Sequence, residues 1–193
     1  MAIKYNKIIF SIFLGFVLLL TAGCADTGQE LHEPISSALT RITKKTFGLK
    51  VSPLNSPVTP EKFSGYHTGV DFETTPNEQN TDVSIYAVCA GSVILKKWAS
   101  GYGGVLVQQC TLEGRNVTII FGHIKLSSIN SEVGQILAPG DLIGVLGKAK
   151  SNETDGERKH LHLGIHKGTD VNIRGYVQSE SELGDWIDAQ KYL

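Results

Sequence analysis

The sequence predicts a mostly β protein: an antiparallel, two-layer, sandwich-like domain with an open groove and few short helices. Three observations favour this class. From about residue 47 onward short apolar stretches alternate with turns, 21 glycines are spread along the chain, and few stretches have helical periodicity. With 193 residues, 41% of them hydrophobic, the chain is long enough to bury one ordinary core.

The expected strands are short apolar or alternating runs bounded by glycine, asparagine or proline. They lie around residues 51, 69–72, 83–89, 92–98, 104–110, 116–122, 141–147 and 161–166. Two polar loops, 74–81 and 148–157, adjoin two of these strands. We expect these loops to wall an open groove in which a long polymer could lie.

The amino terminus reads as a targeting segment. Lys4 and Lys7 precede an apolar run over 8–20, followed by the small residues 21–23. The run is shorter than the roughly 20 residues that span a bilayer. Cys24, directly after Ala-Gly, resembles the cysteine of a bacterial lipobox, so we expect it to carry lipid and to anchor the domain outside the cytoplasmic membrane. A plain secretory signal or an uncleaved anchor is the alternative.

The expected domains are therefore a lipoprotein signal peptide over 1–23, a polar tether with a short helix over 24–46, and one folded domain over 47–193. The net charge is −1, and no basic stripe is present. This charge pattern argues against a nucleic-acid partner.

Export changes the meaning of Cys89 and Cys110, which remain as an even pair in an oxidising compartment. They lie nearly symmetrically about the glycine-rich turn at 99–103, so they could face each other across a hairpin. We expect a disulfide, with two buried free thiols as the alternative.

Two short motifs far apart in the chain supply metal-binding side chains. The first motif is His67-Thr68-Gly69-Val70-Asp71, and the second is His160-Leu161-His162. In a strand, residues two or four apart face the same way, so each motif can present its side chains together. Two imidazoles and a carboxylate can hold one zinc ion and leave its fourth position to water, with one imidazole to spare.

From about residue 47 to residue 193 the chain resembles the lysostaphin/LytM family of zinc metallopeptidases, also called β-lytic endopeptidases. The resemblance rests on five functional positions in order, separated by glycine-rich stretches that include Gly101-Tyr102-Gly103-Gly104, Phe121-Gly122-His123-Ile124 and Pro139-Gly140-Asp141. It implies that His67, Asp71 and His162 bind one zinc ion per chain. It also implies that His123 and His160 stand beside a metal-activated water, and that the substrate is a peptide bond in peptidoglycan cross-links.

Some positions depart from the family pattern. Glu157-Arg158-Lys159 precedes His160 where a small Gly-Pro-like turn is usual, which leaves the groove rim and the substrate preference open. Glu73, two residues past Asp71, is expected to be an ordinary exposed acid, with a role beside the metal ligands as the alternative.

Two other functions compete with a peptidase. Relatives that have lost ligands act as non-catalytic regulators or wall-binding modules that activate another hydrolase, but this chain retains all five positions. Val133-Gly134 and 139–144 also resemble the hairpin of lipoyl or biotinyl carriers. Those carriers need a lysine at a hairpin tip, typically beside methionine, and Met1 is the only methionine here.

Overall fold

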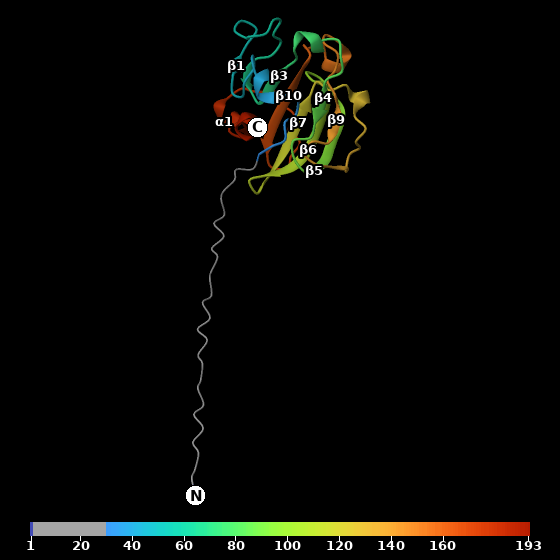
Figure 1. Cartoon of the computed structure of the whole chain (residues 1–193). Coiled ribbons are helices and arrows are strands. Elements are labelled where there is room, and N and C mark those ends of the chain that lie inside the picture. The colour runs from blue at the N-terminus through green and yellow to red at the C-terminus, as the bar shows by residue number, and fades with distance from the viewer. Residues whose placement is uncertain (2–29) are drawn as a thin grey trace.

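The structure of the chain, a computed structural model, describes residue 1 and residues 30–193 (Figure 1). The predicted signal peptide and lipid-modified Cys24 lie outside the described residues. Within the part that is described, no helix is long and apolar enough to cross a membrane.

Strands dominate the described chain and helices are short, which confirms the predicted mostly β class. The strands are β1 (Lys50–Val51), β2 (Gly65–His67), β3 (Gly69–Glu73), β4 (Ser84–Tyr86), β5 (Gly91–Ala99), β6 (Gly103–Leu112), β7 (Arg115–Gly122), β8 (Ile136–Leu137), β9 (Leu142–Val145), β10 (His160–Lys167), β11 (Tyr176–Val177) and β12 (Trp186–Ile187). The helices are α1 (Glu180–Leu183) and the 3-10 helices η1 (Ala38–Arg41), η2 (Pro76–Glu78), η3 (Leu126–Ser128), η4 (Asn152–Thr154) and η5 (Ala189–Tyr192).

The central sheet is antiparallel and has the order β12-β10-β7-β6-β5-β8, with β3 also paired to β10 (Figure 1). Strands β1, β2 and β11 form a small sheet, and β4 pairs with β9. Strands β2, β8, β11 and β12, of two or three residues each, were not predicted. Such short runs cannot establish an alternating pattern, so only their partners define them as strands.

The core lies between one face of the central sheet and a second layer. Leu161, Leu163 and Ile165 alternate along β10 and are fully buried. They belong to the same apolar cluster as Ile85 of β4 and Ile143 of β9. Strand alternation therefore turns the histidines of β10 to the opposite face of the sheet.

Residues 30–46, the greater part of the predicted tether, pack against the domain. Leu31, Ile35 and Ala38 are buried in the main core, at 6%, 1% and 0% exposure. The backbone N–H of Leu31 donates to the carbonyl of Tyr192, and Pro34 accepts from Tyr86. The short helix expected in this segment is η1. Apolar residues spaced along a polar stretch did not reveal this docking, because their partners come from distant elements.

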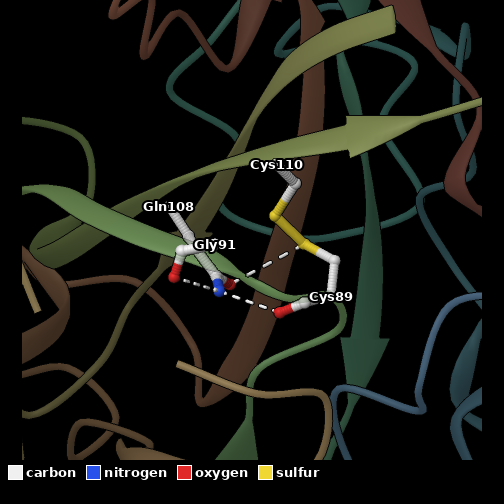
Figure 2. Close-up of a disulfide and its surroundings, with 4 residues drawn as sticks. All are labelled: Cys89, Gly91, Gln108 and Cys110. Carbon is white, nitrogen blue, oxygen red and sulfur yellow. Dashed lines mark hydrogen bonds between the residues drawn. A yellow bond between two sulfur atoms is a disulfide. The ribbon is translucent and has the colours of Figure 1, made fainter. Parts of the chain in front are cut away.

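The predicted disulfide between Cys89 and Cys110 is present, with Cα atoms 6.3 Å apart (Figure 2). Cys110 lies in β6 opposite Gly91, and Cys89 precedes β5. Beside the bridge, the buried amide of Gln108 donates to the carbonyls of Cys89, at 2.9 Å, and Gly91, at 3.2 Å. The bridge and this amide join the chain before β5 to β6.

Candidate metal centre

Three adjacent strands bring the distant motifs together. In the register of the central sheet His162 of β10 lies opposite Asp71 of β3 on one side and Gly122 of β7 on the other. His123 follows directly after β7, and His67 ends β2 just before β3 begins. The sheet therefore collects side chains that are up to 95 residues apart in the sequence.

The three predicted ligands form a nearly equilateral triangle of atoms. His67 Nε2 lies 3.0 Å from His162 Nδ1 and 3.2 Å from Asp71 Oδ1, and the last two atoms are 3.1 Å apart. Tetrahedral zinc with bonds of about 2.0–2.1 Å holds its ligand atoms about 3.3 Å apart. The spacing of the triangle suits one divalent cation, and these residues form a group able to hold a metal.

A hydrogen bond beside the triangle determines which nitrogen of His67 carries the proton. His67 Nδ1 donates to the carbonyl oxygen of Thr46 at 3.1 Å, so neutral His67 presents the lone pair of Nε2 to the triangle. One proton on His162 Nδ1 would satisfy only part of the triangle, whereas a cation satisfies all three atoms. The backbone N–H of Asp71 donates to the carbonyl of Lys45 at 3.0 Å, which holds β3 to the amino-terminal segment.

Burial and charge keep these groups in the protonation states that bind metal. Burial favours the neutral acid at Asp71, but the charges of His67 and His160 and the hydrogen bonds of His160 and His162 hold its pKa well below the usual value. Burial lowers the pKa of His162 to about 4 against the opposing effect of Asp71. At neutral pH Asp71 is therefore a carboxylate and His162 a neutral imidazole.

The two remaining predicted histidines lie beside the triangle. His160 Nδ1 donates to the carbonyl of Arg158 at 2.9 Å, and His160 Nε2 lies 3.3 Å from Asp71 Oδ2. The His123 ring is 4.3 Å from the His160 ring, centroid to centroid. Burial, followed by the charge of His160, holds the pKa of His123 well below its usual value. All five predicted site residues are therefore gathered in one buried place.

A groove of about 690 Å³ opens over these residues, so the predicted groove is present. The prediction that loops 74–81 and 148–157 wall it is wrong, because no residue of the first loop and only Glu157 of the second lies in its lining. Its lining includes Phe63, Tyr102, Arg158, Arg174 and Tyr176, besides the histidines.

Sequence reasoning missed the lining residue Tyr102. Its hydroxyl is buried with no hydrogen-bond partner among the described residues, and its ring lies 5.3 Å from that of His162. A Cβ on Gly122 would come within 2.3 Å of this ring, so glycine makes room for it. Glycine on both sides of Tyr102 was the only signal.

Glu73 differs from expectation. Its side chain is only 11% exposed and is bound by Arg158, so the prediction of an ordinary exposed acid is wrong. The reason is tertiary. The strand pairing sets Glu73 opposite His160, within reach of an arginine 85 residues away.

The antiparallel sheet and its histidine-lined groove define the class of domain, and comparison with known proteins gives the family. Residues 65–173 match the sequence profile described as Peptidase family M23. The match covers more than half of the chain, so the chain belongs to this family. This confirms the resemblance to the lysostaphin/LytM peptidases.

Several solved structures are similar to this chain, and LytU and lysostaphin share its fold. LytU is 24% identical, with a TM-score of 0.50, and the match covers 79% of this chain and 90% of that one. Lysostaphin is 21% identical, with a TM-score of 0.50 and coverage of 79% and 54%. Csd3 of Helicobacter pylori is 23% identical, with a TM-score of 0.48 and coverage of 79% and 36%. The chain thus spans about a third of Csd3 and about half of lysostaphin. No curated protein matches the sequence significantly.

Proposed function

We propose that this chain is a zinc metalloendopeptidase that cleaves peptide bonds in bacterial peptidoglycan cross-links. The observation that carries the proposal is the triangle of His67 Nε2, Asp71 Oδ1 and His162 Nδ1, with two further imidazoles beside it. Membership of a family of peptidases that act on peptidoglycan supports the substrate class.

In this proposal His67, Asp71 and His162 hold one zinc ion. When bound, zinc would supply a Lewis acid that acidifies water and polarises the scissile carbonyl. The protein's own residues exclude solvent and orient the ligands. The three ligand residues are 1%, 1% and 3% exposed, and Thr46 fixes the tautomer of His67.

His160 carries the proton transfer and His123 orients the water. Because His160 Nδ1–H donates a hydrogen bond to the Arg158 carbonyl, the neutral ring has its lone pair on Nε2. This lone pair can accept a proton from the attacking water. Asp71 Oδ2, 3.3 Å away, stabilises that proton on Nε2 until it passes to the leaving amine. The lowered pKa of His123 keeps this ring neutral at physiological pH, so it can orient the water as a hydrogen-bond acceptor.

We also propose that the protein is exported to the bacterial cell envelope and is anchored through lipid on Cys24, with the domain outside the cytoplasmic membrane. The sequence around Cys24 supports this location. So does the Cys89–Cys110 disulfide, because disulfides persist in oxidising compartments. An anchor of this kind would hold the groove beside the cell-wall polymer.

The deciding experiment is to incubate residues 25–193 with purified peptidoglycans and to identify the products by mass spectrometry. New amino and carboxyl termini are expected, their formation should stop when a chelator removes the metal, and zinc should restore it. New reducing sugar ends would indicate a glycosidase. A wild-type protein that binds no zinc and releases no termini would instead favour the non-catalytic regulator.

A further inference from the structure

Arg158 joins two carboxylates at the edge of the metal centre. Its Nη2 donates to Asp71 Oδ2 at 2.8 Å and to Glu73 Oε1 at 2.6 Å. Its Nε adds contacts to Glu73 Oε1 at 3.0 Å and Oε2 at 3.1 Å. The three side chains are 17%, 2% and 11% exposed, so this ion-pair cluster is largely sheltered from solvent.

Strand geometry explains why the cluster forms. Antiparallel pairing sets His162 opposite Asp71 and His160 opposite Glu73. Because side chains two residues apart share a face, Arg158 continues the row of His160 and His162 just before β10 begins. The arginine therefore meets both carboxylates of β3 from across the strand pair.

The two oxygens of the Asp71 carboxylate have different contacts. Oδ1 faces the triangle, within 3.2 Å of His67 Nε2 and 3.1 Å of His162 Nδ1. Oδ2 accepts from Arg158 Nη2 and lies 3.3 Å from His160 Nε2. A carboxylate held in this way can give a metal only one oxygen. Without the guanidinium, it could turn to present both oxygens and fill the position that hydrolysis needs for water.

Charge balance explains the presence of Glu73. A guanidinium this close would repel a divalent cation and compete with it for Asp71. Glu73 neutralises that charge through its contacts with both Nε and Nη2. On its outer side it also meets Lys44 Nζ at 3.3 Å, from a side chain that is 43% exposed. Arginine can thus orient the ligand without cancelling its charge.

We propose that Arg158, held by Glu73, is a positioning residue that keeps Asp71 a one-oxygen ligand and so sets the affinity and coordination number of the metal. The inference rests on the proposed function of the site, but it concerns residues outside the five predicted ones. It also gives a role to Glu157-Arg158-Lys159, the segment that departs from the family pattern.

Metal affinity and coordination test this proposal independently of activity. The zinc dissociation constant of Arg158→Gln, measured by competition with a chromophoric chelator, should rise by about 10–100-fold over wild type, because losing the orientation of Asp71 outweighs the gain of its second oxygen. With cobalt as probe, the visible absorption of Arg158→Gln should weaken, as expected when a four-coordinate ion gains a ligand. Arg158→Lys keeps the charge but not the planar guanidinium, so its zinc dissociation constant should lie between those of wild type and Arg158→Gln. Glu73→Gln leaves the guanidinium uncompensated and should also weaken zinc binding.

Lys96→Gln is the matched control. Lys96 is 19% exposed and paired with Glu132 at 3.0 Å, and β5 carries it outside the groove lining. Its zinc affinity and cobalt spectrum should equal those of wild type.

Wild-type affinity and spectrum in Arg158→Gln would overturn the proposal, as would an equal loss in Lys96→Gln. If Arg158→Gln does not fold, Arg158→Lys decides, and an unchanged dissociation constant there rejects the inference. The proposed function would survive either result, provided wild type binds zinc and releases new termini. A wild type without metal affinity would reject both.

Discussion

At the scale of single residues, His160 and His162 lie two positions apart on one strand face, and we propose different roles for them. The Nδ1 atom of His162 belongs to the ligand triangle, whereas His160 meets only the outer oxygen of Asp71. A tetrahedral ion with three protein ligands has one further position, which hydrolysis reserves for water. We therefore assign the metal to His162 and the proton transfer to His160.

We predict different losses in the two alanine variants. His162→Ala should lose both zinc and activity. His160→Ala should keep near-stoichiometric zinc while turnover falls by about 10²–10⁴, the usual contribution of a positioned acid–base group. Elemental analysis, read beside peptidoglycan hydrolysis, measures both. A metal-free His160→Ala and a zinc-loaded His162→Ala would reverse the assignment.

The residues of this site differ in how far the sequence could reveal them. His67, Asp71, His160 and His162 could be found because they lie in two short motifs whose side chains can share a strand face. His123, and the role of each residue, came from the resemblance to a family. Tyr102 and Arg158 could not, because their roles depend on contacts across the groove and the sheet. Arg158 can form ion pairs with Asp71 and Glu73 only when β3 pairs with β10.

At the scale of elements, the segment over residues 30–46 is part of the folded domain and supports the candidate site. It buries three apolar side chains in the core, and the carbonyls of Lys45 and Thr46 hold Asp71 and His67. Arg41 reinforces the segment by donating to both oxygens of Glu78, at 2.7 and 2.8 Å. Two of the three proposed metal ligands are therefore held by a segment that precedes the family match.

Removing this segment should destabilise the domain and weaken metal binding. Leu31 and Ile35 each represent about 1.5–3 kcal/mol of apolar burial, out of a net stability of about 5–15 kcal/mol. A chain over 47–193 should unfold at lower denaturant and bind zinc more weakly than one over 30–193. Ile35→Ala, which leaves the site contacts in place, should lose about 2–5 kcal/mol. Equal unfolding free energies for the two chains would contradict this role.

The Arg41–Glu78 pair predicts a dependence of stability on pH. The hydrogen bond from Arg41, opposed by burial, lowers the pKa of Glu78 to about 2. The unfolded carboxyl takes up its proton at higher pH than the folded one. The contribution is thus complete above about pH 5 and is lost as pH falls toward 2. Glu78 is a quarter exposed, so solvent screening limits the effect to about 1 kcal/mol.

Urea unfolding of wild type and Glu78→Gln at pH 7, 5, 4 and 3 tests this sign. The difference in unfolding free energy should be largest at pH 7 and should shrink below pH 5. Glu132→Gln, at a carboxylate that is 79% exposed, is the control and should differ little from wild type at any pH. A Glu78→Gln difference that stays constant with pH would refute the assignment.

The disulfide links two further elements. It closes a loop with a sequence separation of 21, which a chain-entropy model values at about 3 kcal/mol. Replacing Cys89 and Cys110 by alanine together should lower the unfolding free energy by about this amount. Unreduced wild-type protein should weigh two hydrogens less than the dithiol form. Two freely alkylated thiols in folded protein made in an oxidising compartment would exclude the bridge.

At the scale of the whole molecule, the described domain faces its groove with charges that are largely paired within the protein. Arg158 is bound to Asp71 and Glu73, and Arg174 to Glu182. Lys45, which also lines the groove, is paired with Glu61 and donates to the Tyr176 hydroxyl. If the proposed function holds, we expect a groove with such paired charges to select its substrate by shape and by groups such as the Tyr102 hydroxyl, which has no hydrogen-bond partner among the described residues.

Location is a property of the whole chain and predicts a modification outside the described domain. Cells that express the protein should incorporate a fatty-acid analogue into it, and the protein should fractionate with membranes. Cys24→Ser should abolish the label and leave the soluble domain active on peptidoglycan. Equal labelling of Cys24→Ser would show that the lipobox interpretation is wrong.

The β class, the principal strands, the cysteine pair and the two histidine motifs of the candidate site could be predicted from the sequence, and the resemblance to a family added His123. Those features depend on local rules: side chains alternate along a strand, glycine permits turns, and ligands on one strand face recur at spacings of two or four. Tertiary structure alone decided that residues 30–46 belong to the domain, that Glu73 is sheltered, and that Arg158 divides the two oxygens of Asp71. These contacts join residues from 21 to 161 positions apart, so their geometry exists only after the strands have paired.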